Sequence, residues 1–129
     1  MHCRLLSITE LGGYPDYVPD YRRLGFAVTT ASSMRKAVAS IRREPPDVIV
    51  AEFNFQSDFR DRTSNLETLM ASLQGLAADP FLIVFFEQEY QPQFDALRQR
   101  FPIHQAFAFP IDKEALLACL SKLKSSVCQ

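Results

Sequence analysis

The chain has 129 residues and a formal net charge of −1, which together exclude several classes of protein. Hydrophobic residues make up 47% of it and charged residues 22%, a balance typical of a globular domain rather than a disordered or fibrous chain. Its Lys and Arg residues are scattered, so we predict no binding to nucleic acid. No apolar run approaches the roughly 18 residues of a membrane-spanning helix, so we predict no membrane contact. The length fits one domain, and we expect residues 1–129 to form it.

The N-terminus and the cysteines both favour a cytoplasmic location. The first residues lead directly into a strand pattern, which leaves no room for a secretory signal. Cys3, Cys119 and Cys128 are odd in number and widely spaced, and no Cys-x-x-Cys motif occurs. We therefore predict reduced thiols in a cytoplasmic protein.

The first part of the chain alternates between strand and helix patterns. Apolar residues at 5–8 and β-branched residues at 26–30 predict two strands. A short helix is expected between them at 19–24, because proline is tolerated in the first turn of a helix. A second helix should begin after Ser32 or Ser33, and its buried face is predicted by an apolar stripe of Met34, Ala37, Val38 and Ile41.

The segment 46–52, Pro-Asp-Val-Ile-Val-Ala-Glu, gives the clearest strand signal in the sequence. Two prolines end the preceding helix, and three of the residues between the two acids are β-branched. A short apolar run with such boundaries is typical of a strand buried on both faces in a parallel sheet. Its last residue, Glu52, would lie at the carboxyl edge, where open α/β sheets bind their ligands.

The second part of the chain continues the same alternation. Residues 81–86 predict another apolar strand, and residues 106–109 predict a short last one. Helices are expected at about 64–75, at 93–100 and after Asp112, which can cap a helix. The repeated strand–helix order favours an α/β fold, with a five-stranded parallel sheet, helices on both faces and flavodoxin-like topology.

Four stretches make nearly the whole chain resemble the receiver domain of bacterial two-component response regulators. They are Gly25-Phe26-Ala27-Val28, the helix containing Ala37-Val38, the strand at 46–50, and Phe109-Pro110-Ile111-Asp112 before the last helix. The resemblance implies a domain of two-component signalling, with a phosphoacceptor aspartate and a Mg²⁺ site.

The functional residues of a receiver can be placed on this sequence one by one, and most of them are changed. The two acids that hold Mg²⁺ at the end of the first strand fall on Thr9 and Glu10. The phosphoacceptor aspartate falls on Glu52. The hydroxyl residue that closes the fourth strand falls on Phe86 or a neighbour, and the lysine before the proline falls on Phe109.

These changes predict a degenerate site that is not phosphorylated. A glutamate places its carboxylate about 1 Å further out than an aspartate, which can reduce a rate on the order of a hundredfold. Phe109 removes a fixed positive charge, and the loss of one acid weakens a divalent-cation site. We therefore predict a pseudo-receiver that works independently of phosphorylation. Its Glu52 is either a mimic of the phosphorylated state or a remnant of the phosphoacceptor site without a function of its own.

A small enzyme or cofactor-binding protein on the same fold is the alternative, with Glu10 and Glu52 as its strand-end acids. Gly12-Gly13 lacks the third glycine of a phosphate-binding loop, and no Gly-x-Ser-x-Gly motif occurs. His2 and His104 are far apart in the sequence and have no second ligand at metal spacing. We predict no enzymatic activity, no cofactor and no metal.

The resemblance also implies where a protein partner binds. Receivers commonly pair through their fourth helix, fifth strand and fifth helix, which here extend from about Gln93 to Lys124. The strand at 106–109 carries no charged residue that would discourage pairing at a sheet edge. We predict that a protein partner or a second copy of the chain docks on this surface.

Overall fold

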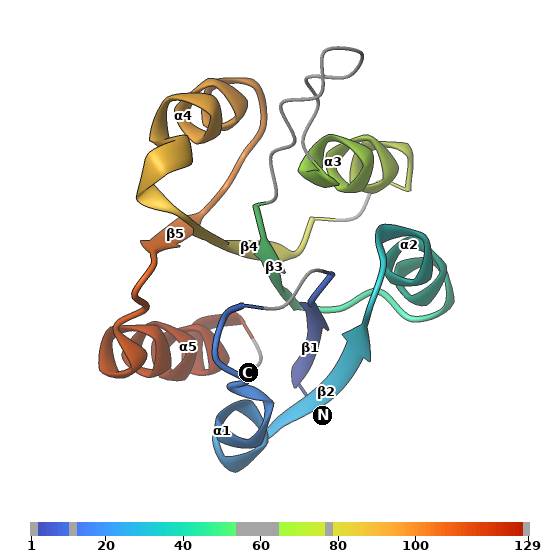
Figure 1. The fold of residues 1–129 in the computed structure, drawn as a ribbon. Coiled ribbons are helices and arrows are strands. Elements are labelled where there is room, and N and C mark those ends of the chain that lie inside the picture. The colour runs from blue at the N-terminus through green and yellow to red at the C-terminus, as the bar shows by residue number, and fades with distance from the viewer. Residues whose placement is uncertain (1–2, 11–12, 54–64, 77–78, 128–129) are drawn as a thin grey trace.

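The computed structural model describes residues 3–10, 13–53, 65–76 and 79–127 (Figure 1). Strands and helices alternate along them: β1 (Cys3–Ile8), α1 (Val18–Arg23), β2 (Phe26–Ala31), α2 (Met34–Arg43), β3 (Val48–Glu52), α3 (Asn65–Gly75), β4 (Phe81–Phe86), a 3-10 helix η1 (Gln88–Tyr90), α4 (Gln91–Arg100), β5 (Gln105–Ala108) and α5 (Lys113–Val127). None of the helices in these ranges is long and apolar enough to cross a membrane.

The strands form one parallel sheet in the order β2-β1-β3-β4-β5, with β3 in the middle. Helices α1 and α5 cover one face of the sheet, and α2, α3 and α4 cover the other (Figure 1). This arrangement confirms the predicted fold class, including its flavodoxin-like strand order. Because all strands run in the same direction, the residues that follow them gather along one carboxyl edge.

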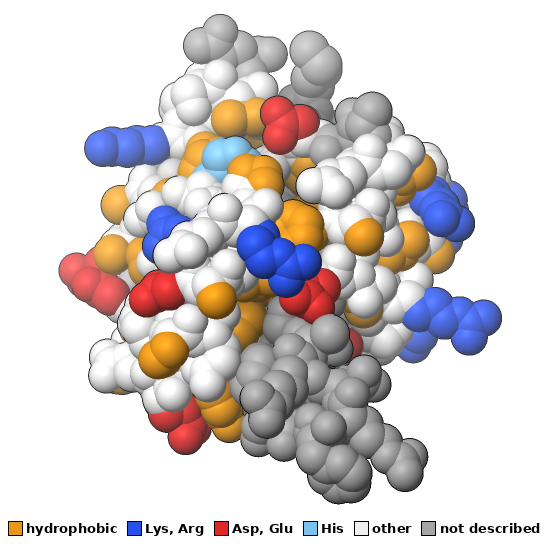
Figure 2. Space-filling view, turned by 90° about the horizontal axis from the view of Figure 1, so that it is seen from above, with side chains coloured by type: hydrophobic (Ala, Val, Ile, Leu, Met, Phe, Trp, Pro, Cys, Tyr) orange, Lys and Arg blue, Asp and Glu red, His pale blue; other side chains and the backbone are white. Residues whose placement is uncertain are grey.

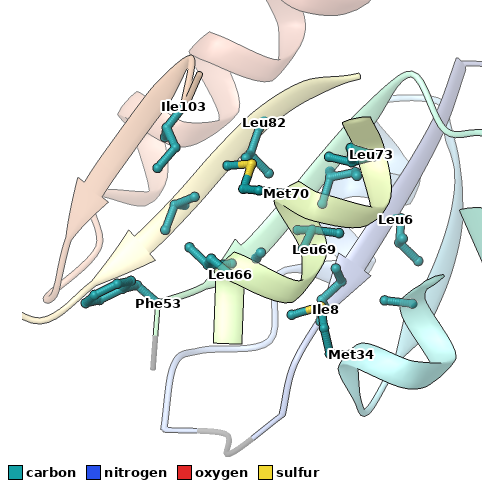
Figure 3. Close-up of a cluster of buried hydrophobic side chains, with 14 of the residues drawn as sticks. Leu6, Ile8, Met34, Phe53, Leu66, Leu69, Met70, Leu73, Leu82 and Ile103 are labelled. Carbon is teal, nitrogen blue, oxygen red and sulfur yellow. The ribbon is translucent and has the colours of Figure 1, made fainter. Parts of the chain in front are cut away.

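Successive side chains of the strands point to opposite faces and build two hydrophobic clusters. On one face, Ile49 and Ala51 of β3 pack in a cluster with α2, α3 and α4, part of which Figure 3 shows. On the other face, Val48 and Val50 pack in a cluster with α1 and α5. The central strand is therefore buried on both faces, as its apolar run predicts.

The predicted buried face of α2 is present, apart from the half-buried Val38, and so are two of the predicted caps. The buried residues of α2 are Met34, Ala37 and Ile41, and those of α5 are Leu116, Leu120 and Leu123. Ser33 Oγ accepts the backbone N–H of Lys36 at 3.1 Å at the start of α2. Asp112 Oδ1 accepts the backbone N–H of Ala115 at 3.2 Å at the start of α5. These side chains satisfy backbone donors that a helix leaves without partners.

Several strand boundaries differ from the prediction by one or two residues, and two of them bear on the site and its sheet. β1 begins at Cys3 rather than Leu5, because its pairing with β2 already starts there, opposite Phe26. β5 ends at Ala108, so Phe109 follows the strand, although its N–H still donates to Phe86 O at 2.8 Å.

The state of one cysteine also differs from the prediction. Cys3 is buried and disulfide-bonded, whereas the sequence predicted reduced thiols. Cys119 is a free thiol, and Cys128 lies outside the described residues. A disulfide depends on close approach in space, which the spacing of cysteines along a sequence does not reveal.

His104, which lies just before β5, makes two hydrogen bonds with Leu82 of β4. Its N–H donates to Leu82 O, and its Nδ1 accepts the N–H of Leu82, each at 3.0 Å. Its ring also stacks on Phe81, with 4.5 Å between the ring centroids. On the face shown in Figure 2, Lys and Arg side chains are dispersed between acidic and uncharged ones.

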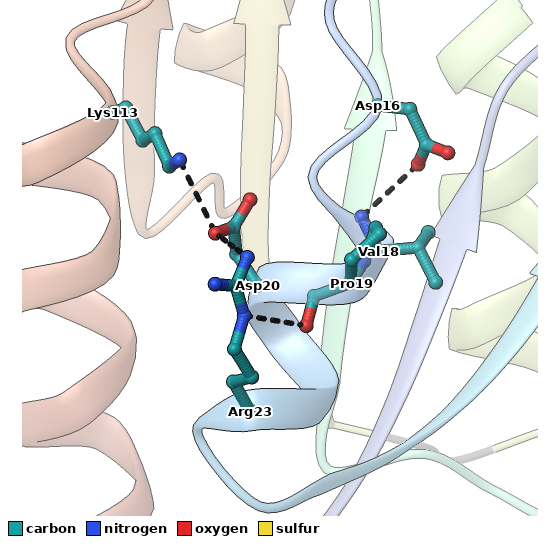
Figure 4. A network of polar contacts seen from close by, with 6 residues as sticks. All are labelled: Asp16, Val18, Pro19, Asp20, Arg23 and Lys113. Atoms are coloured by element: carbon teal, nitrogen blue, oxygen red, sulfur yellow. Dashed lines mark hydrogen bonds and ion pairs between the residues drawn. The ribbon is translucent and has the colours of Figure 1, made fainter.

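A buried carboxylate joins α1 to α5 (Figure 4). The side chain of Asp20 is 11% exposed, and its Oδ1 lies 2.7 Å from Nη2 of Arg23 and 3.3 Å from Nζ of Lys113. A buried charge is costly without such partners, so the two cations offset the burial of this carboxylate where α1 packs against α5.

The turn between α1 and β2 depends on Gly25. Its φ of +98° lies in the left-handed region, and a Cβ atom there would collide with the side chain of Lys124. The Nζ atom of Lys124 donates to Leu24 O at 2.8 Å and so ties α5 to this turn.

We predict that Gly25→Ala lowers the free energy of unfolding by about 1–3 kcal/mol, because alanine is strained at positive φ and would displace Lys124. Chemical denaturation measures this difference. Gly75→Ala is the matched control, since Gly75 is helical and has open space where a Cβ would lie. The control should change stability little or raise it slightly. Equal losses in the two variants would contradict this account of the turn.

Candidate functional site

Strand β3 ends at Glu52, which is buried at the carboxyl edge of the sheet. This residue is 3% exposed, and its Oε1 accepts the backbone N–H of Glu10 at 3.3 Å. Glu52 is also in register with Phe85 of β4. The carboxylate therefore lies inside the protein, where an external reactant has little access to it.

Four aromatic residues lie beside this end of the sheet: Tyr14, Tyr17, Phe85 and Phe109, which we call the aromatic cluster. The Tyr14 ring lies 5.7 Å from the ring of Phe85 and 5.7 Å, edge-on, from that of Phe109. Tyr17 meets Phe85 edge-on at 6.2 Å. Tilted and edge-to-face pairs of this kind are favourable, so the rings support one another in a fixed arrangement.

The electrostatic environment of the aromatic cluster is negative. Burial raises the pKa of the Tyr14 phenol well above its usual value, and the carboxylates of Glu87 and Glu52 raise it further. A side-chain hydrogen bond with Glu89 raises the pKa of Glu87, with smaller contributions from burial and from the charge of Glu89. Negative groups around the end of β3 and β4 disfavour the approach of another anion.

A pocket of about 740 Å³ lies next to Glu52. Its wall is formed by the carboxyl ends of β1, β2 and β3 and by the segment that leads into α1, with Glu52 and Phe85 on the side of the aromatic cluster. Its volume falls within the range of about 300–1,000 Å³ that is usual for small-molecule sites.

The structure brings three of the predicted site residues together. Thr9 and Glu52 both line the pocket, and the backbone of Glu10 donates to Glu52. Phe86 points to the opposite face of the sheet, where it stacks on Phe94 at 4.4 Å. Because neighbouring strand residues alternate between faces, Phe85 is the β4 residue beside Glu52.

The other two predicted site residues lie after β5. Phe109 is 42% exposed and joins the aromatic cluster through its contact with Tyr14. Pro110 is exposed and follows Phe109 through a cis peptide bond. Phe109 thus places an aromatic ring, rather than a charge, near the end of β4.

Side-chain oxygens suited to Mg²⁺ occur on Thr9, Glu10 and Glu52. Within the described ranges, however, no group of three or more His, Cys, Asp or Glu side chains is arranged to hold a metal ion. Any cation held here would therefore depend on Glu10, Glu52 and the Thr9 hydroxyl.

Tyr14, Tyr17 and Tyr21 all line the pocket and were not predicted as site residues. Only Tyr21 lies on α1, since Tyr14 and Tyr17 precede its first residue, Val18, so no helical spacing relates the three. Two prolines in the same segment, Pro15 and Pro19, indicate a break rather than a helix, and the three rings come to one pocket only through the fold.

No protein-family model matches the sequence, and no curated protein matches it at the sequence level. Solved structures do match the fold. The REC domain of AraT, a response regulator from Geobacillus stearothermophilus, has a TM-score of 0.75 at 14% identity, covering 100% of this chain and 98% of that chain. The chemotaxis response regulator CheY4 of Vibrio cholerae has a TM-score of 0.71 at 18% identity, covering 95% and 99%.

A two component transcriptional regulator AraC from Clostridium phytofermentans is also similar, with a TM-score of 0.70 at 17% identity and coverage of 98% of this chain and 95% of that chain. These structures share the strand order and layers described above over almost their whole length. The fold of the chain is therefore that of response-regulator receiver domains.

Tyr21, which lines the pocket, should make the stability of the protein depend on pH in the alkaline range. Burial raises the pKa of Tyr21 above its usual value, with further contributions from Tyr17, Asp16 and Asp20. The neutral phenol is therefore favoured in the folded protein, so its contribution to stability is complete below pH about 10 and is lost as the pH rises further.

We predict that the free energy of unfolding falls as the pH rises above about 10, and that Tyr21→Phe makes this fall less steep. Urea unfolding measured between about pH 8 and pH 11 tests the slope. Tyr90→Phe is the matched control, because Tyr90 does not line the pocket. An unchanged slope in Tyr21→Phe would show that this phenol is not held in its neutral form.

Proposed function

We propose that this chain is a receiver-like signalling module that acts in the cytoplasm through protein–protein contacts, without phosphorylation and without catalysis. The burial of Glu52, at the position where a receiver carries its phosphoacceptor, is the observation on which the proposal rests. A protein of this kind would transmit a signal by binding, not by chemistry at the end of β3.

The Glu52 carboxylate is poorly accessible to a phosphoryl donor. A phosphoryl group must be placed in line with the attacking oxygen while its charge is neutralised. Glu52 is only 3% exposed, and its Oε1 already accepts the backbone N–H of Glu10. An oxygen held in this way is poorly placed for in-line attack on an external donor.

The fixed positive charge expected at position 109 is also missing. Phe109 stands where the resemblance to receivers implies a lysine, and its ring packs against Tyr14. Lys113, the next lysine along the chain, contacts Asp20 on α1 at 3.3 Å. The transferring phosphoryl group would therefore lack the fixed positive charge that stabilises its transition state.

We predict that incubation with acetyl phosphate and Mg²⁺ adds no phosphoryl group to the protein, as measured by intact mass. Glu52→Asp alone should not restore phosphorylation, because the cation expected at position 109 and one acid would still be missing. A phosphoryl mass that appears on the unaltered protein and disappears in Glu52→Ala would overturn the proposal.

The surface formed by α4, β5 and α5, from Gln93 to Lys124, is the proposed contact surface. β5 is an edge strand of the sheet, so its outer backbone groups can pair with another chain. Arg98 on α4 and Lys122 on α5 are exposed on either side of it. Together they offer backbone pairing and charge to a protein partner or to a second copy of the chain.

We predict self-association through this surface, detectable by sedimentation under reducing conditions at about 50 µM if the Kd lies below that concentration. The double variant Arg98→Glu/Lys122→Glu should shift the protein toward monomer. Arg35→Glu, an exposed charge reversal on α2, is the control and should leave association unchanged. A monomeric protein whose partner binding also survives the double reversal would show that the surface is wrongly assigned.

A further inference from the structure

Three residues that carry hydroxyl groups are largely buried and line the pocket. Ser7, Tyr17 and Tyr21 are 7%, 8% and 2% exposed, and all three line the pocket. In the part of the chain that the structure describes, none of their hydroxyl groups has a hydrogen-bond partner. These hydroxyl oxygens are not among the buried, unpartnered polar atoms of the described residues, so they are open to the pocket and can bond to water or a ligand there.

The three hydroxyls come from two elements that meet only in the folded protein. Ser7 is on β1, on the face of the sheet that α1 and α5 cover, and it pairs in register with Thr30 of β2. Tyr17 and Tyr21 come from the segment that enters α1 and from α1 itself. The pocket is thus bounded by the sheet on one side and by phenol groups on the other.

The rim of the pocket carries further hydroxyl groups, on Thr9, Thr30 and Ser32, which are exposed. A hydroxyl both donates and accepts a hydrogen bond, so a lining of this kind suits a ligand that does the same at several positions. Apolar side chains such as Val50 and Phe85 complete the wall and suit the carbon skeleton of such a ligand.

Formal charges among the described lining residues cancel. Asp16 and Glu52 are acidic, whereas Arg22 and Lys36 are basic. Two of these groups already have local partners, since Asp16 Oδ1 accepts the N–H of Val18 at 3.0 Å (Figure 4) and Lys36 Nζ donates to Ser32 Oγ at 3.2 Å. A balanced pocket does not select for a strongly charged ligand, so an uncharged molecule fits it better than a phosphate or a diamine.

We propose that this pocket binds a small uncharged ring compound with several hydroxyl groups, of the sugar or cyclitol type. Its hydroxyl groups would hydrogen-bond to Ser7, Tyr17 and Tyr21. The inference goes beyond the proposed signalling role and does not depend on the α4–β5–α5 surface.

Titration of the ¹⁵N-labelled protein with D-glucose, D-ribose and myo-inositol tests the proposal by ¹H–¹⁵N correlation spectra. Each compound is added to about 50 mM, which would largely saturate a site with a Kd of a few millimolar. We expect saturable shifts of the Ser7, Thr9, Tyr17 and Tyr21 amides with at least one compound. Melting temperature is not a suitable readout, because excluded polyols stabilise most proteins.

The double variant Tyr17→Phe/Tyr21→Phe should bind the same compound at least tenfold more weakly, whereas Tyr90→Phe should bind it as the unaltered protein does. The double variant should also unfold at the same denaturant concentration or a higher one, because the two hydroxyl groups that it lacks make no hydrogen bond within the folded protein. A lower midpoint would show that these hydroxyls are partnered in the protein, which contradicts the premise.

Putrescine and inorganic phosphate serve as charged comparison ligands in the same titration. Saturable binding of either one without binding of the three neutral compounds would overturn the proposal, as would the absence of saturable shifts with all five. Shifts spread evenly over the protein, or unchanged in the double variant, would indicate binding as an adventitious additive only and would overturn it as well.

Discussion

Each residue of β3, from Val48 to Glu52, is buried, and both edges of the strand are paired with neighbouring strands. A strand without an exposed face or edge requires a helical layer above and below it. Helices α1 and α5 form one layer, and α2, α3 and α4 form the other. The same packing holds the last side chain of the strand inside the protein, where a carboxylate needs polar partners. The N–H of Glu10 is one of them, so the covering of the sheet determines how Glu52 is placed.

The carboxyl edge of the sheet has two different halves. Around β4 and β5 it is aromatic, with Tyr14 in contact with both Phe85 and Phe109. Around β1 and β2 it opens into the pocket, whose lining includes Ser7 and Tyr21. The aromatic half occupies the place where the resemblance implies a lysine and a phosphoryl group. The polar half keeps an open pocket at the end of the sheet, which is where folds of this class generally bind ligands.

Most of the fold could be predicted from the sequence because its signals are local. The apolar run of β3 and the stripe of Met34, Ala37 and Ile41 on α2 needed only neighbouring residues to be recognised. The pocket could not be predicted, because β1, β2, β3 and the segment before α1 meet only in the folded chain. Which residue at the end of β4 lies beside Glu52 depends on the register of the strand, because a shift of one residue exchanges its two faces. For that reason Phe85, rather than Phe86, lies beside Glu52.

The hydrogen bond from Lys124 to Leu24 O joins residues that are 100 positions apart. During synthesis the N-terminal part of the chain is made first, and a domain generally folds as a unit. The strands β1 and β2 and the helix between them can therefore emerge from the ribosome long before α5 exists. Until α5 has been made and has packed against the sheet, the turn at Gly25 lacks the ammonium group that holds it. The earliest part of the chain to be synthesised thus completes its own turn only with a residue from the last helix.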